Sequence, residues 1–155
     1  MPDIVTPEAR SRMMSGIKGK NTRPELAIRH GLHNLGFRYR LHDPHLPGKP
    51  DLVLKKYRTA IFVNGCFWHG HSCHLFKWPG TRDEFWRQKI GRTRDRDIEK
   101  REILMALGWR IIEVWECALK GRTRMSQDEV ISRIVAALES DCKYTIIEGC
   151  DENTL

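Results

Sequence analysis

The sequence lacks the segments that would direct it into or across a membrane. Among its 155 residues no apolar run approaches the ~18 that a membrane span needs, and the opening stretch MPDIVTPEAR has no apolar signal-peptide core. Internal repeats, low-complexity tracts and linkers are also missing. We therefore expect one domain over residues 1–155, cytoplasmic rather than secreted or membrane-bound.

The excess of positive charge lies in the body of the chain. Lys and Arg total 27 against 20 Asp and Glu, a net charge of +7. Residues 126–155 hold two basic and seven acidic residues, a net −5, which leaves +12 on residues 1–125. A basic body indicates a polyanionic partner, nucleic acid first of all. We expect residues 141–155 to form a flexible acidic tail.

Helix and strand signals alternate along the chain. Three capping-box patterns, each a Ser or Thr followed three residues later by Glu, start at Thr22, Thr81 and Ser126. They predict a helix over about 23–35, a long charged helix ending near 107, and a helix after 126, while Thr6-Pro7 predicts a short earlier one. Short segments rich in β-branched or aromatic residues predict strands at 37–41, 52–54, 59–63 and 109–115. This order predicts an α/β sandwich with a mixed central sheet.

Asp51 follows a turn and precedes an apolar strand. Residues 46–54 read LPGKPDLVL, in which proline and glycine favour a turn. A carboxylate held at a strand end suits a hard divalent cation such as Mg²⁺. An ordinary turn aspartate is the alternative.

Cysteine and histidine gather in one window. Five cysteines without a signal peptide favour metal binding over disulfides. The soft donors of Cys66, His71, Cys73 and the distant Cys117 would complete a tetrahedral zinc site with no open position, which is a structural site. On spacing alone His69 or His74 could replace His71. Buried free cysteines are the alternative.

The same region is unusually aromatic. Seven of the thirteen Phe, Trp and Tyr residues lie within residues 62–86, among several Lys and Arg. Phe67 and Trp68 are adjacent in a predicted loop, and Trp86 lies near the start of the following helix. Such a pair could push between stacked bases. Core packing is the alternative, and it is the role that we expect for Trp109 and Trp115.

The combination of these motifs resembles one bacterial family. Pro50-Asp51, Cys66-Phe-Trp-His-x-His-x-Cys73 and Trp115-Glu-Cys117, together with Asn21-Thr-Arg-Pro-Glu25 and Thr81-Arg-Asp-Glu-Phe-Trp86, resemble the very short patch repair (Vsr) DNA mismatch endonucleases from about residue 8 to about residue 125. The resemblance implies a restriction-endonuclease-like three-layer sandwich with a structural zinc site. It further implies a monomeric, Mg²⁺-dependent nickase that cuts one strand on the 5′ side of the thymine in thymine–guanine mismatches. These mismatches arise when 5-methylcytosine deaminates.

The resemblance also implies residue roles. Asp51 would be the metal-binding carboxylate, with the backbone carbonyl of Val63 as a further Mg²⁺ ligand, and His69 would be the general acid/base. Glu25 would be a supporting acidic residue, although as the third residue of a capping box it could serve only the helix end. The zinc ligands would be Cys66, His71, Cys73 and Cys117. The residues that would contact DNA are Phe67, Trp68, Trp86 and, in the basic N-terminal segment 1–20, Met14.

Two other functions remain open on the sequence. One is a non-catalytic, zinc-stabilised DNA-binding module, which would need neither Asp51 nor His69. The other is a nuclease of the same fold with another DNA substrate. The leading prediction implies repair proteins and a methyltransferase as pathway partners, and a location on the nucleoid through DNA.

Overall fold

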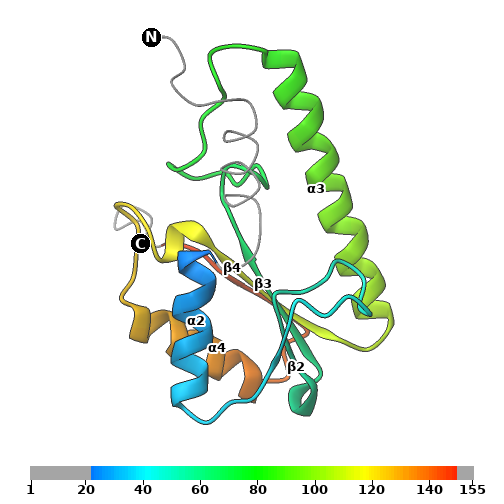
Figure 1. Cartoon of the computed structure of the whole chain (residues 1–155), viewed down its shortest axis with the longest axis vertical. Coiled ribbons are helices and arrows are strands. Elements are labelled where there is room, and N and C mark those ends of the chain that lie inside the picture. The colour runs from blue at the N-terminus through cyan, green and yellow to red at the C-terminus, as the bar shows by residue number, and fades with distance from the viewer. Residues whose placement is uncertain (1–21, 150–155) are drawn as a thin grey trace, which may run out of the picture.

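A five-stranded mixed sheet forms the centre of the molecule (Figure 1). The computed structural model describes residues 22–149. The helix expected after Thr6, the basic segment 1–20 with Met14, and residues 150–155 lie outside the described residues. Within the described part no helix is long and apolar enough to cross a membrane.

The strands lie in the sheet in their chain order. They are β1 (Arg40–Leu41), β2 (Leu52–Leu54), β3 (Thr59–Asn64), β4 (Arg110–Trp115) and β5 (Tyr144–Ile147). The pairs β1–β2 and β2–β3 are antiparallel, whereas β3–β4 and β4–β5 are parallel. The two parallel pairs need crossover connections, which the helices α3 and α4 supply. The mixed sheet predicted from the sequence is therefore confirmed.

In the described part of the chain three α-helices surround the sheet: α2 (Arg23–Asn34), α3 (Asp83–Ala106) and α4 (Gln127–Glu139). The first and last begin as predicted. The Thr22 hydroxyl accepts the Glu25 N–H at 3.4 Å, and the Ser126 hydroxyl accepts the Glu129 N–H at 3.1 Å. Each bond satisfies one of the free N–H groups at a helix start.

The second predicted capping box is wrong. Helix α3 begins one residue later than that pattern requires, and its N-cap is Arg82 in the left-handed region (φ 54°) without a side-chain cap. In this position the Arg82 guanidinium lies 4.2 Å from the ring centre of Phe85. A Ser or Thr caps a helix only from the N-cap position itself, and Thr81 lies outside it.

Helices cover both faces of the sheet, which gives three layers. The larger core joins α2 and α4 to one face through Ile28, Leu32, Leu52, Leu54, Ile61, Ile112, Val114, Val130, Ile134 and Leu138. On the opposite face Leu104 of α3 packs against Ala60 and Ile111. Successive residues of β4 thus point to opposite layers, as a strand buried on both faces requires.

The expected flexible tail is wrong for residues 144–147. They form β5, which pairs in parallel with β4 and buries Ile147. The chain is directed into this strand by Arg110, whose guanidinium donates to the carbonyls of Leu138 at 3.0 Å, Ala137 at 3.3 Å and Ser140 at 2.5 Å. These bonds satisfy the carbonyls at the end of α4.

The strand predicted at 37–41 is shorter in the structure and consists of β1 alone, because only Arg40 and Leu41 reach a partner on β2.

Candidate active site and metal centre

Asp51 lies immediately before β2 and is fixed to the neighbouring strand. Its Oδ2 accepts the backbone N–H of Val63 on β3 at 2.7 Å. The side chain is 27% exposed and lines a cleft of about 670 Å³. The carboxylate is therefore held on rigid backbone and still open to the cleft.

Two further side chains converge on this carboxylate. Glu25, from the first turn of α2, is 2% exposed, and its Oε1 lies 2.5 Å from Nε2 of His42. The same nitrogen lies 4.0 Å from Oδ1 of Asp51. The donor atoms of these three residues all lie within 4.8 Å of one another. We call Glu25, His42 and Asp51 the acidic corner.

Burial makes the acidic corner costly when it is fully ionised. Desolvation, with a smaller effect of the nearby Glu25 carboxylate, raises the pKa of Asp51 to about 7 from its ordinary 3.8. The Val63 N–H and His42 act in the opposite direction. A divalent cation would replace the proton that Asp51 otherwise retains. Two carboxylates and an imidazole are a donor set that fits such a cation.

His69 lies on the loop after β3 and faces the same cleft. Its Nδ1 lies 2.5 Å from Oδ2 of Asp97, which α3 brings back over the loop. A carboxylate on Nδ1 holds a proton there and leaves Nε2 as the proton acceptor of the neutral ring. Such an arrangement would suit a proton acceptor that faces the cleft.

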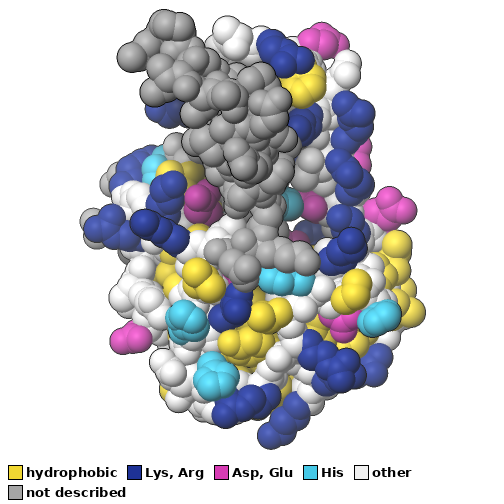
Figure 2. Space-filling model, in the orientation of Figure 1, with side chains coloured by type: hydrophobic (Ala, Val, Ile, Leu, Met, Phe, Trp, Pro, Cys, Tyr) yellow, Lys and Arg dark blue, Asp and Glu magenta, His cyan; other side chains and the backbone are white. Residues whose placement is uncertain are grey.

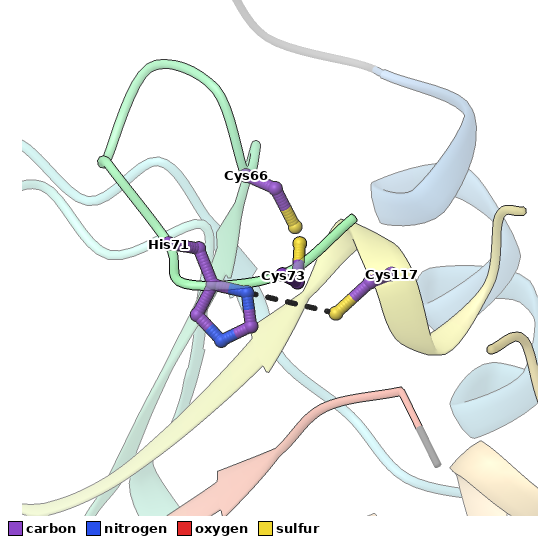
Figure 3. Close-up of side chains that lie close together, drawn as sticks. All are labelled: Cys66, His71, Cys73 and Cys117. Carbon is purple, nitrogen blue, oxygen red and sulfur yellow. Dashed lines mark hydrogen bonds between the residues drawn. The ribbon is translucent and has the colours of Figure 1, made fainter. Parts of the chain in front are cut away.

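The predicted thiol cluster is assembled as expected. Donor atoms of Cys66, His71, Cys73 and Cys117 lie within 4.8 Å of one another, and the three sulfurs point toward a common centre (Figure 3). We call these residues the thiol tetrad. His71 Nδ1 lies 3.7 Å from the Cys117 sulfur. Among the histidines left open by spacing, His71 is the one in the tetrad, whereas His69 is turned to Asp97.

The tetrad is supported by groups around it. The Gly149 N–H donates to the Cys117 sulfur at 3.2 Å, and Nε2 of His71 lies 2.7 Å from Oε2 of Glu148. The His71 ring stacks on Trp115 with ring centres 4.1 Å apart. The Cys66 thiol and the Gly149 N–H lower the pKa of Cys117 to about 6. Three thiols and an imidazole, oriented from outside, fit a closed tetrahedral metal site.

The three aromatic residues predicted to push between stacked bases are Phe67, Trp68 and Trp86, and they form one cluster beside the cleft. We call this cluster the aromatic wedge. Phe67 lies 5.0 Å from Trp68 and 5.3 Å from Trp86 between ring centres, and all three are half-buried. Phe67 and Trp68 line the cleft together with Asp51 and His69. Trp109 is also half-buried, but it packs under α3 against the second core.

Basic side chains surround this cleft. Those that line it are Lys49, Lys89, Arg96, Lys100, Arg101 and Lys120. Figure 2 shows Lys and Arg side chains along the length of α3. The cleft that Asp51 and His69 line therefore carries the positive charge expected of a nucleic-acid surface.

Sequence reasoning missed two residues of the site, His42 and Asp97. His42 lies beyond the two-residue strand β1, where no motif marks it. Asp97 belongs to the charged run RDRD, which looks like an ordinary solvent-exposed helix face. The helical spacing of Asp97 could have identified it. One face of α3 is formed by Lys89, Thr93, Asp97 and Lys100, and all four line the cleft.

Known proteins share most of this chain. The family model described as DNA mismatch endonuclease Vsr matches residues 2–75. The type II nicking enzyme V.XorIIP of Xanthomonas oryzae is 47% identical over 119 residues, 77% of this chain and 88% of the relative. The DNA mismatch endonuclease Vsr of Escherichia coli is 42% identical over 134 residues, 86% of each chain. The type II nicking enzyme V.NmeAIP of Neisseria meningitidis is 45% identical over 122 residues, 79% of this chain and 87% of the relative.

The raised pKa of Asp51 predicts a pH-dependent cost to folding. Because the folded pKa of about 7 exceeds the ordinary 3.8, the folded chain retains a proton that the unfolded chain loses, so stability falls as pH rises from 3.8 to about 7. Asp51→Asn removes this cost and keeps the acceptor for the Val63 N–H. In buffer without Mg²⁺ the variant should exceed the wild type by roughly 1–4 kcal/mol at pH 8 and by clearly less at pH 5. Urea unfolding at both pH values measures this, and an equal difference at both would contradict it.

Proposed function

The chain belongs to the Vsr family of DNA mismatch endonucleases, and on this premise we propose that it nicks one strand 5′ of the thymine in a thymine–guanine mismatch. The substrate would arise from deamination of 5-methylcytosine, and the cut would begin very short patch repair. One observation carries the proposal: Asp51 and the His69–Asp97 pair line a single basic cleft. A non-catalytic DNA-binding module would need neither.

The chemistry would be divided between the two walls of the cleft. Asp51 and the backbone carbonyl of Val63 would hold Mg²⁺, with Glu25 supporting them. When bound there, Mg²⁺ supplies Lewis-acid stabilisation of the charge that develops on the phosphate. His69 would take the proton of the attacking water at Nε2, and Asp97 would keep the ring in the tautomer that can do so. A restriction-endonuclease-like core is the fold that we propose for this arrangement.

Mismatch selectivity would come from the aromatic wedge. Opening a base step costs a few kcal/mol and costs least where pairing is already poor, so side chains that fill an opened step favour a mismatch. Phe67 and Trp68 are adjacent and half-buried at the rim of the cleft, and Trp86 lies against both. Trp86 would therefore hold the rings of Phe67 and Trp68 in place.

The thiol tetrad would hold a structural zinc ion. Its four donors leave no open position for substrate, so its effect would be on the loop that carries Phe67, Trp68 and His69 between Cys66 and His71. We further propose that the protein acts as a monomer on the nucleoid of a bacterial cytoplasm, within a pathway that also involves repair proteins and a cytosine methyltransferase.

Nicking of end-labelled duplexes tests the proposed function. With Mg²⁺ the wild type should cut the thymine-containing strand of a thymine–guanine duplex and leave matched duplexes intact. Asp51→Ala should abolish cutting and retain mismatch binding, since alanine offers the cation no oxygen. If the wild type bound mismatched duplexes but cut them with none of the divalent cations tested, the DNA-binding module would be favoured. Efficient cutting of matched duplexes would favour another substrate.

Loss of a tetrad thiol should remove metal and stability together. Because the binding free energy of a structural zinc ion contributes to folding, Cys117→Ala should lower both zinc content and melting temperature. Elemental analysis should find about one zinc per wild-type chain. Cys142→Ala is the matched control, as Cys142 is exposed and outside the tetrad. The zinc assignment would be refuted if the wild type contained no zinc, or if removal of its zinc left the melting temperature unchanged.

Removal of the Trp68 ring should narrow the preference for mismatched over matched DNA. Trp68→Ala should weaken binding to the mismatched duplex more than to the matched one, by roughly the 1–3 kcal/mol of a base–aromatic stack. Titrations of both duplexes give the ratio. Trp109→Phe is the control and should alter stability without altering that ratio. Equal losses for both duplexes in Trp68→Ala would show that the ring only packs.

A further inference from the structure

His42 supplies a nitrogen donor to the acidic corner that the proposed mechanism does not use. Its Nε2 lies 2.5 Å from Oε1 of Glu25 and 4.0 Å from Oδ1 of Asp51, and its side chain is 13% exposed. The three donor atoms lie within 4.8 Å of one another, so one ion could bind all three residues once the His42–Glu25 hydrogen bond opens. The nitrogen donor and the carboxylate oxygens thus converge in a largely buried corner.

The backbone at His42 turns the ring toward this space. Its N–H donates to the carbonyl of Asp51 at 3.1 Å, and its φ of 48° lies in the left-handed region. Residues other than glycine adopt that region at a cost, although histidine tolerates it better than most. The hydrogen bond to Asp51 holds the strained residue beside the carboxylate that the ion would bind.

The charges of the corner also call for a cation rather than a proton alone. Glu25 and Asp51 together carry two negative charges when ionised, and their donor oxygens lie within 4.8 Å of each other in a largely buried corner. A hydrogen bond between His42 and Glu25 does not neutralise Asp51. Arg29 lies 3.4 Å from Oε2 of Glu25 and offsets part of that charge, so a divalent ion bound by both carboxylates and a neutral imidazole would chiefly compensate Asp51.

We propose that Nε2 of His42 is a direct ligand of the catalytic cation, and that it tunes the site toward Mn²⁺ over Mg²⁺. Oxygen-only sites suit Mg²⁺, whereas an imidazole nitrogen favours first-row transition ions. The inference rests on the proposed metal-dependent nuclease and adds the specificity of its ion. His42 thereby becomes the residue that decides which metal occupies the corner.

Mn²⁺ bound to the zinc-loaded protein gives a direct test. Pulsed electron paramagnetic resonance should detect modulation by a coordinated imidazole nitrogen in the wild type, and His42→Gln should lose it. Calorimetry should show that His42→Gln weakens Mn²⁺ binding by about 10-fold or more and changes Mg²⁺ binding less than about 3-fold. His45→Gln, an exposed histidine three residues away, is the control and should match the wild type in both measurements.

The outcomes separate this inference from the proposed function. Wild-type Mn²⁺ spectra without nitrogen modulation, or equal losses of Mn²⁺ and Mg²⁺ affinity in His42→Gln, would show that His42 only orients Glu25 and would overturn the inference. If the wild type still nicks mismatched DNA with Mg²⁺ in that case, the proposed function stands. Failure of the wild type to bind either ion or to nick would overturn both.

Discussion

The parallel pairing of β3 with β4 is the constraint on which both candidate metal sites depend. Its register runs from Thr59 opposite Arg110 to Asn64 opposite Trp115, so the two strands end side by side. Cys66 and Cys117 follow those ends by two residues each, which brings their thiols together. Asp51 is tied to the same strand through the Val63 N–H. Parallel pairing also demands a crossover, and the crossover helix α3 returns Asp97 to His69.

The two clusters on this frame differ in chemistry and share one physical problem. The acidic corner concentrates oxygen donors that repel one another when ionised, and the thiol tetrad concentrates sulfur donors that must lose protons to bind metal. In both places a bound metal ion would stabilise the ionised donors. The pKa of Asp51 is raised by burial and Glu25, while that of Cys117 is lowered by a neighbouring thiol and the Gly149 N–H. Metal content and stability should consequently change together at both places.

Most of the helices and strands could be predicted from local sequence patterns. The features that could not be predicted depend on contacts between residues far apart in the sequence. The tetrad could be predicted because three of its donors lie within eight residues, although the choice of His71 depended on tertiary position. His42 and Asp97 were missed because their partners lie 17 and 28 residues away. Strand β5 was missed because its four residues form a strand only by pairing with the edge of β4, which is distant in the sequence. The capping box predicted at Thr81 does not form, although the local pattern is present. Arg82 takes the N-cap position of α3 instead, and its guanidinium packs on Phe85.

The contacts of Glu148 and Gly149 with the tetrad have a consequence for how the protein is made. His71 meets a partner 77 residues further along the chain, and Cys117 meets one 32 residues further. On a translating ribosome, the loop with His69 emerges long before α3 and β5 can hold it in place. The nascent chain therefore carries the reactive groups without their geometry. The thiol tetrad is fully supported only after Glu148 and Gly149 have been added, so the loop that carries His69 acquires its complete set of contacts late in folding.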